Sequence, residues 1–340
     1  MLRTRLSTGL LIGVLASLSF GTSGALAKPL MEAGWSPALA VTVRAGLAGI
    51  VLLPFALVAL KGAWPVLWRG RWRILAMAVI GVAGTQLAYF TAIERIPVSS
   101  GLLIEYLAPL LLVAGVAVAT RRVPRLVVLI GSALAIGGLV LIIGPVGGGD
   151  SAGYLFAGIA AVGCALYYVI AARPAEGLPP VVLAAGGLLF GSLSLGVVGL
   201  LGLVPFEVGS YEVPALGGFA PWWMPLSVLA VTTAFGYATS ITASQLLGSR
   251  LMSFVGMLEV VFASLFAWAL LGEALGPWQA LGGVLILIGI ACVRSEKPVD
   301  APLETAPLFV VMPADEPEVT SAVLPPMTEQ PPTEPLMIVR

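Results

Sequence analysis

Two glutamates, Glu105 and Glu259, lie inside strongly apolar stretches, LLIEYLAPLLLVAGVAVA and SFVGMLEVVFASLFAWALL. A charged side chain at the centre of a bilayer costs roughly 2.5–3.5 kcal/mol on insertion scales, so it faces a partner or a water-filled cavity rather than lipid. Such a carboxyl can carry a proton or pair with the ammonium group of a solute. The alternative is a protonated carboxyl that bonds a neighbour on its own helix. The pattern favours a proton or solute pathway.

Other polar side chains occupy the apolar segments as well. Arg44 stands about eight residues into the second such segment, where it either reaches the outer membrane surface or binds a substrate carboxylate. A cavity with Arg44 at one end and a glutamate at the other would suit a zwitterionic amino acid. Aromatic and amide side chains could add polar contacts or simply pack between helices: Gln86, Tyr89, Tyr106, Tyr167, Tyr168 and Tyr237.

The composition identifies an integral membrane protein. Of 340 residues, 59% are hydrophobic and 10% are charged, against about one quarter charged in soluble domains. The net charge of zero gives no basic field for nucleic acid. Cys164 and Cys292 both lie in apolar segments, so we expect small buried side chains and no disulfide.

Several kinds of chemistry are disfavoured. Histidine is absent, which removes His-dependent triads and HExxH metal sites. The GTSG run at 21–24 resembles a motif of intramembrane serine proteases, but that chemistry lacks its base here. No GxxxxGK[ST] phosphate loop occurs, so direct use of ATP is not expected. We predict no catalytic residue, metal or cofactor.

Apolar runs of about 20 residues must be helices in a bilayer, because only a helix satisfies its own backbone there. Ten such spans are predicted, at 7–27, 36–60, 73–93, 98–119, 124–144, 152–172, 179–203, 223–246, 250–271 and 276–293. With the N-terminus inside the cell, all 17 basic residues except Lys28, Arg44 and Arg95 fall in cytoplasmic segments. This asymmetry predicts that both termini lie in the cytoplasm. We expect the membrane to be the plasma membrane.

Tryptophan agrees with these spans, because aromatic side chains collect at membrane interfaces. All eight lie at or near predicted span ends: Trp35, Trp64, Trp68, Trp72, Trp222, Trp223, Trp268 and Trp278.

The two ends of the chain need separate interpretation. The start MLRTR, an apolar run and then Ala25, Leu26 and Ala27 resemble a signal peptide with a cleavage site, which would leave nine spans. From 295 to 340 the chain is rich in Pro, Glu, Asp and Thr, and we expect a disordered cytoplasmic tail.

A weak internal repeat joins the fifth and tenth spans. GSALAIGG at 131–138 and GGVLILIG at 282–289 align at an offset of 151 residues. Because one repeat holds five spans, the second copy enters the membrane from the opposite side, as in many secondary transporters. In this register Glu105 corresponds to Gly256, and Glu259 lies three residues further on, so both carboxylates are expected near the midplane.

The halves themselves resemble a known family. The run LEVVFASLFAWALLGEAL followed by WQALGGVLILIGI is similar to the EamA family of the drug/metabolite transporter superfamily, over about 7–294. RAGLAGIVLL from Arg44, LIEYLAPLLL around Glu105 and TRRVP at 120–124 are most similar to its threonine and homoserine exporter branch. The resemblance implies a ten-helix exporter with a central cavity that works by alternating access.

Two departures from the family pattern stand out. Its LGE motif occurs at 271–273, whereas the first-half counterpart at 120–122 reads TRR. The Glu-Pro pair common in the ninth span is here Glu259 followed by Val260, so no proline is present to break that helix.

The sequence therefore predicts an all-α protein of two inverted five-helix repeats, 1–147 and 148–294, followed by the tail. Its predicted function is export of a small metabolite, an amino acid such as threonine or homoserine, by a proton-coupled secondary transporter. The alternatives are an exporter of drugs or other metabolites and a non-transporting receptor or scaffold. The candidate substrate or proton site consists of Glu105, Glu259, Arg44, Gln86, Tyr89, Tyr106 and Tyr168.

Overall fold

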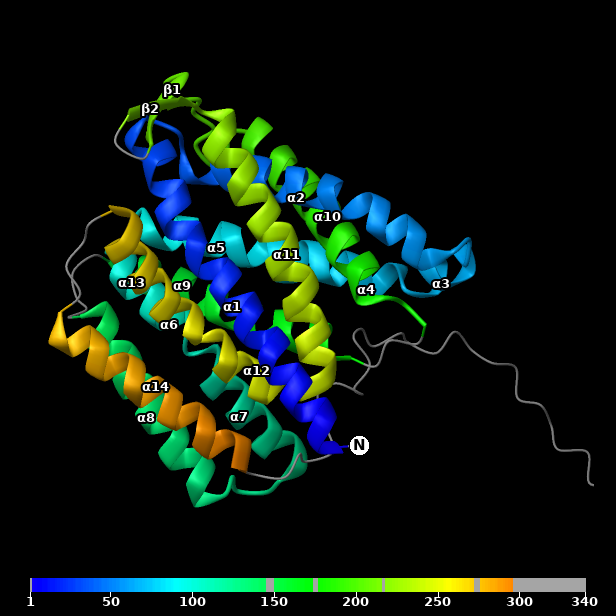
Figure 1. The fold of residues 1–340 in the computed structure, drawn as a ribbon, viewed down its shortest axis with the longest axis vertical. Helices are drawn as coiled ribbons and strands as arrows, with labels where there is room; N and C mark the ends of the chain where they lie inside the picture. The colour runs from blue at the N-terminus through cyan, green and yellow to red at the C-terminus, as the bar shows by residue number, and fades with distance from the viewer. Residues whose placement is uncertain (1, 145–149, 174–176, 216–217, 272–275, 296–340) are drawn as a thin grey trace, which may run out of the picture. The chain divides into compact units, whose positions relative to one another are not determined.

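The computed structural model describes residues 2–144, 150–173, 177–215, 218–271 and 276–295. Ten helices in this part are long and apolar enough to cross a membrane (Figure 1). The all-α membrane fold predicted from the sequence is therefore confirmed. The predicted tail beyond residue 295 and the glutamate of the LGE motif, Glu273, lie outside the described residues.

The first half of the chain contains α1 (Leu2–Glu32), α2 (Pro37–Leu60), α3 (Trp64–Arg69), α4 (Arg71–Ala76), η1 (Met77–Gly84), α5 (Thr85–Ile93), α6 (Val98–Glu105), α7 (Ala108–Thr120) and α8 (Leu126–Ile143). The second half contains α9 (Ser151–Ala172), α10 (Pro180–Leu200), β1 (Glu212–Ala215), β2 (Gly218–Pro221), α11 (Trp223–Leu247), α12 (Ser249–Gly256), α13 (Leu258–Leu271) and α14 (Pro277–Ser295). Three spans are composite: α4 with η1 and α5, α6 with α7, and α12 with α13.

The offset of 151 residues inferred from the glycine pattern recurs in the helix bounds. The eight residues of α6, Val98–Glu105, correspond to the eight of α12, Ser249–Gly256. The helices α8 and α14 begin at Leu126 and Pro277, again 151 residues apart. The last two spans of each half are thus built to one plan.

Four glycines hold α8 and α14 together. Gly131 packs against Gly289 and Gly138 against Gly282, so that the pairing is reciprocal between the two halves. A Cβ added at Gly289 would lie 2.6 Å from the carbonyl oxygen of Gly131, closer than any side chain allows. Small residues permit this approach of helix backbones in membranes. If the two halves are related by a two-fold axis, contacts between them are reciprocal, as these are.

The fourth and ninth spans are each interrupted near the middle. Between α6 and α7 the N–H of Leu107 bonds the carbonyl of Ile104 at 3.0 Å, and between α12 and α13 the N–H of Met257 bonds that of Phe254 at 3.1 Å. These are tightened turns of the i to i−3 type, which a helix can adopt without proline. In the ninth span this tightened turn occurs although Val260 stands where relatives often have proline.

The third span contains a π-helical segment, η1, directly before α5. The hydroxyl of Thr85 reaches back five residues to the carbonyl of Ile80 at 2.8 Å. Thr85 also packs against Gly163 of α9. Short π-helical segments often lie next to functional sites, and this one precedes Gln86 and Tyr89.

Helix α1 is integrated into the bundle. The Ser17 hydroxyl donates to the carbonyl of Val255 at 2.9 Å. Gly21 lies against Phe262 of α13, where a Cβ would come within 2.6 Å of the Phe262 Cβ. Gly21, the first glycine of the GTSG run, therefore serves the packing of α1 against α13.

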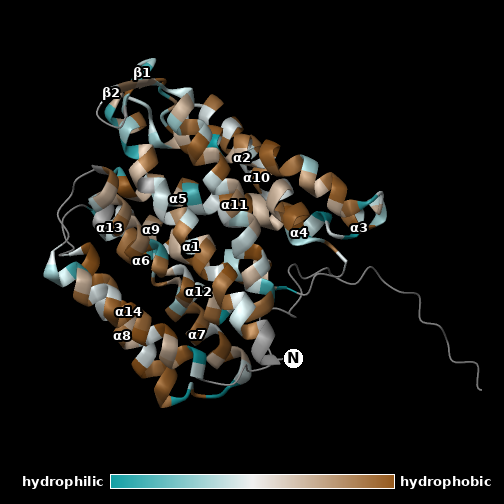
Figure 2. Cartoon of the chain, in the orientation of Figure 1, coloured by the Kyte–Doolittle hydropathy of each residue, from teal (hydrophilic) through white to brown (hydrophobic). Residues whose placement is uncertain are grey.

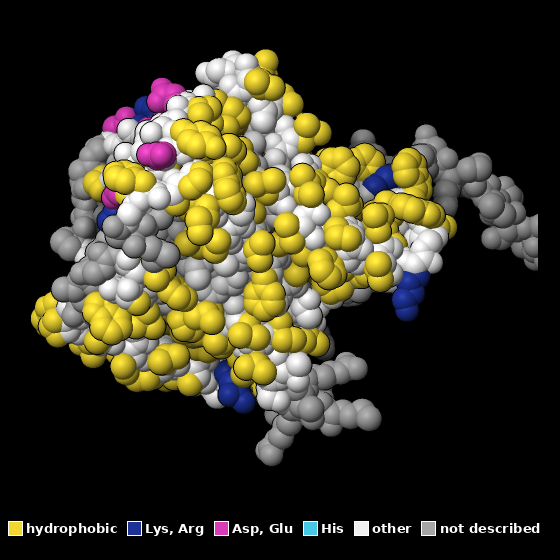
Figure 3. All heavy atoms as spheres, turned by 45° about the horizontal axis from the view of Figure 1, so that its top comes forward, with side chains coloured by type: hydrophobic (Ala, Val, Ile, Leu, Met, Phe, Trp, Pro, Cys, Tyr) yellow, Lys and Arg dark blue, Asp and Glu magenta, His cyan; other side chains and the backbone are white. Residues whose placement is uncertain are grey.

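The surface separates by hydropathy and by charge. Hydrophobic residues cover the sides of the helices, while hydrophilic residues lie mainly near helix ends (Figure 2). Figure 3 shows the acidic side chains gathered at one end of the described part, with a few basic side chains beside them and the other basic side chains further away. The described acidic residues outside the spans all belong to predicted outer segments: Glu32, Glu94, Asp150, Glu207 and Glu212.

A small hairpin closes the acidic end. Strands β1 and β2 pair antiparallel from Glu212 with Pro221 to Ala215 with Gly218. Beneath it, Val213 packs with Leu30, Trp35, Leu226 and Leu229 in one buried cluster. The hairpin is thus fixed to the ends of α1 and α11.

Candidate functional site

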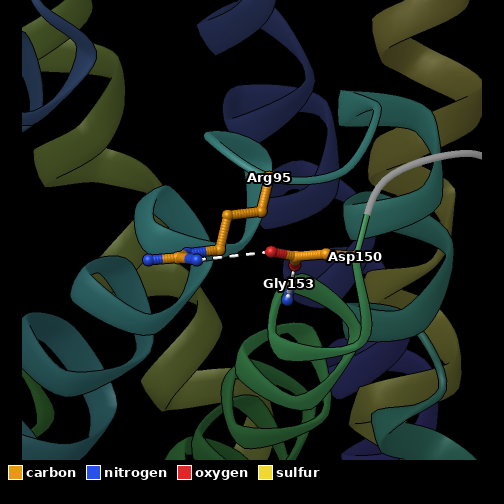
Figure 4. Close-up of polar contacts among 3 residues, drawn as sticks. All are labelled: Arg95, Asp150 and Gly153. Carbon is orange, nitrogen blue, oxygen red and sulfur yellow. Dashed lines mark hydrogen bonds and ion pairs between the residues drawn. The ribbon is translucent and has the colours of Figure 1, made fainter.

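Helix α9 carries one wall of the site, and both of its ends are tied to the third span. At its start the Asp150 carboxylate accepts the Gly153 N–H at 2.8 Å and pairs with Arg95 at 3.3 Å (Figure 4). At its other end Arg73 donates to the carbonyls of Ile170 and Ala171, each at 3.1 Å. The first contact is an N-cap, and the second places a cation at the negative end of the helix dipole.

Aromatic side chains from three helices form that wall. The ring of Tyr167 lies 5.2 Å from that of Tyr168 and 5.8 Å from that of Tyr237 on α11. Phe20 of α1 extends the series, 5.3 Å from Tyr237. The buried Tyr167 hydroxyl donates to Ser240 at 3.0 Å. All these pairs are edge-to-face, the geometry that aromatic quadrupoles prefer.

The two carboxylates lie where their spans are interrupted. Glu105 is the last residue of α6, and Glu259 belongs to the first turn of α13. A helix N-terminus bears partial positive charge, which favours a carboxylate there. The charges of Glu105 and Glu259 act on one another, and the Tyr106 side chain hydrogen-bonds Glu259. Tyr89 of α5 lies within the field of Glu105.

Arg44 of α2 belongs to the same group of charges. Its guanidinium interacts electrostatically with Tyr237 and with Glu259. Its Nε atom is buried and has no hydrogen-bond partner. Within the described residues no ion pair joins Arg44 to a carboxylate. Arg44 and Glu259 thus interact electrostatically without forming an ion pair.

Tyr168 explains why the two halves differ at this point. Its hydroxyl lies against Gly256, and a Cβ at that position would also come within 3.1 Å of the Tyr168 Cζ. Gly256 is the register counterpart of Glu105. The ring and hydroxyl of Tyr168 occupy the volume that a side chain at position 256 would need.

The ionisable side chains of the cluster are only partly enclosed. Arg44, Glu105, Glu259 and Tyr106 are half-buried, whereas the flanking Tyr167 is buried. Each is surrounded by side chains of other helices and keeps some accessible surface.

Six of the seven residues predicted for the site come together: Arg44, Tyr89, Glu105, Tyr106, Tyr168 and Glu259. The seventh, Gln86, is half-buried one turn before Tyr89. Among the described residues, no hydrogen bond or charge interaction links Gln86 to the other six.

The structure adds Cys164 and Ser240 to the cluster. The two cysteines are free and half-buried, and Cys164 lies within the fields of Glu105 and Glu259. The interpretation of Cys164 as a plain buried side chain missed this position. Its place one turn before Tyr168, and that of Ser240 three residues after Tyr237, are the helical spacings that mark a shared face.

In the part of the chain that the structure covers, no three His, Cys, Asp or Glu side chains gather as metal ligands. The groups assembled here are instead a cation, two carboxyls and several phenols. Such groups can bind a charged solute or hold a proton.

The model of the EamA-like transporter family matches the sequence twice, at 7–144 and at 151–295. The chain belongs to the EamA-like transporter family. The two matches together cover the ten spans. It is therefore a multi-pass membrane transporter, a class of protein that moves small molecules across a bilayer.

Two other proteins are similar to this chain over most of its length. A protein of Salmonella typhimurium named as the uncharacterized inner membrane transporter YicL is 24% identical over 298 residues, 85% of this chain and 96% of its own. One solved crystal structure superposes with a TM-score of 0.69 at 23% identity, over 84% of this chain and 96% of the solved chain. The similarity to the solved structure shows that the two chains share a fold.

Proposed function

We propose that this transporter exports a zwitterionic amino acid, such as threonine or homoserine, by proton-coupled alternating access. The observation that carries the proposal is that Arg44 and Glu259 interact electrostatically without an ion pair between them, while the Arg44 Nε is buried and has no hydrogen-bond partner. A buried donor without a partner costs about 1–3 kcal/mol. A bound substrate carboxylate would remove that cost by accepting from the guanidinium, whose fork matches a carboxylate.

The opposite end of the substrate has its own partners. The ammonium group would bind Glu259, which Tyr106 already orients. Glu105 adds a second carboxyl within the same field. Because two nearby carboxylates repel one another, one of them is better held protonated until the ammonium arrives. Exchange of that proton for the substrate would couple the two movements.

The interrupted helices give the exchange a mechanical basis. The breaks between α6 and α7 and between α12 and α13 are equivalent in the two halves. Inverted repeats of this kind typically rock against one another around a midplane site. We place both termini in the cytoplasm of a cell bounded by the plasma membrane, and the concentration of Lys and Arg in the predicted cytoplasmic segments supports this orientation.

Efflux from cells tests the site. Cells that produce the wild type, Glu105→Gln or Glu259→Gln would be challenged with toxic amino acid analogues, and efflux of labelled amino acids would be measured. Both variants should lose most of the efflux and resistance. Glu94→Gln removes an acid outside the spans and serves as the control. Undiminished efflux by both site variants would refute the assignment.

Proton coupling needs a separate experiment. Purified transporter in proteoliposomes should accumulate substrate faster when a pH gradient is imposed. Transport that is indifferent to the gradient would overturn the coupling and leave the substrate assignment intact.

A further inference from the structure

A groove lies outside the transport site, at the end of the bundle where α3, α4 and α10 meet. It encloses about 580 Å³ and is lined chiefly by Trp64, Leu67, Trp68, Trp72, Leu75 and Phe190. We call it the tryptophan groove. Its volume falls within the range of roughly 300–1,000 Å³ that small-molecule sites occupy. The indoles are open at its rim, with Trp68 69% exposed.

One cation is built into this wall. The Arg71 guanidinium lies 4.5 Å from the ring centre of Trp68 and 5.4 Å from that of Trp72. Its Nη1 donates to the carbonyl of Trp68 at 2.7 Å. A guanidinium has five N–H donors, so several remain for an anion. These contacts hold the guanidinium against the indoles that line the apolar groove.

The surrounding charge has one sign. Lys61 and Arg69 are exposed in the connection between the second and third spans, which leads into Arg71. No acidic residue occurs from 61 to 93. An anion at Arg71 would therefore meet two further cations and no competing carboxylate on this segment.

We propose that the tryptophan groove binds an anionic phospholipid, with its phosphate on Arg71 and Arg69 and an acyl chain along the indoles. A free phosphate would leave the apolar wall unused, and a lipid uses both halves of the site. Basic pockets beside spans are typical of sites for anionic headgroups, and tryptophan is enriched at this depth. The assignment to the cytoplasmic leaflet rests on the proposed orientation, whereas the binding itself does not depend on the transported substrate.

Native mass spectrometry of the purified transporter tests this site. The protein would be supplied with equal amounts of phosphatidylglycerol and phosphatidylcholine. The wild type should retain phosphatidylglycerol in preference. Arg69→Ala and Arg71→Ala should each reduce that preference about fivefold, and the double variant about 25-fold, from the contribution of each cation near an anionic surface.

Two variants keep the result interpretable. Arg71→Lys preserves the charge and should preserve most of the preference. Arg122→Ala removes an exposed cation from another loop on the same side and should leave the preference unchanged. Equal retention of the two lipids by the wild type would overturn the proposal. A dimer free of phospholipid would also overturn it, because the groove would then receive a second copy.

Discussion

Gly256→Ala probes the asymmetry between the two carboxylate positions. The added Cβ would collide with the Tyr168 hydroxyl and lie 3.1 Å from its Cζ. Overpacking of this kind costs about 2 kcal/mol, and replacing a helical glycine returns about 0.7 kcal/mol. The net loss in the wild-type background is therefore about 1 kcal/mol.

Tyr168→Phe removes the oxygen that the added Cβ would strike, since the hydroxyl is the atom nearest to a Cβ at position 256. In this background the ring carbon Cζ still lies 3.1 Å from the added Cβ and must give by a few tenths of an ångström, so Gly256→Ala should be close to neutral. The two changes thus couple by about 1 kcal/mol, within the usual range for residues in contact. At about 2 °C per kcal/mol for a chain of this size, the coupling is worth about 2 °C in Tm.

Thermal unfolding in detergent of the wild type, both single variants and the double variant measures this coupling. Gly158→Ala, at a helical glycine with nothing within 4 Å of an added Cβ, is the control and should not lower Tm. Strictly additive Tm changes, or an unchanged Tm for Gly256→Ala, would refute the placement of Tyr168.

Two other predictions concern the frame around the site. Gly138→Ala should lower Tm by about 2–6 °C, because the added Cβ meets the α14 backbone, whereas Gly137→Ala, in open space, should leave it equal or higher; equal effects would argue against the four-glycine crossing. Asp150→Ala should cost about 1 kcal/mol through loss of the α9 cap, and Arg95→Ala less than half of that, because the pair is about half exposed; denaturant unfolding that ranks the two in reverse order would contradict this account.

Much of the fold follows from the sequence. Span lengths and polarity predict the ten helices, since a bilayer leaves the backbone few alternatives. The glycine spacing predicts the 151-residue offset, which the helix bounds reproduce. The tightened turn at Met257 escaped prediction, because it depends on a local change of hydrogen bonding and not on a proline.

The site was harder to derive in full. Glu105 and Glu259 are conspicuous because charge in an apolar run is costly. Arg44 left two possibilities open from the sequence, since only the packing of α2 against its neighbours decides which way its side chain turns. Cys164 carries no such signal, because a cysteine in a small-residue helix is ordinary until its neighbours are known.

Direct binding measurements test the central claim, that Arg44 and Glu259 hold the two ends of a zwitterion. Calorimetry would compare threonine, an analogue without the carboxylate and an analogue without the ammonium group on the wild type, Arg44→Gln and Glu259→Gln. Arg44→Gln should weaken threonine at least about 30-fold, the effect of removing one partner of a buried charge pair, and leave the analogue without a carboxylate unaffected. Glu259→Gln should spare the analogue without the ammonium group. Equal losses for all three ligands, or wild-type affinity in either variant, would contradict the account.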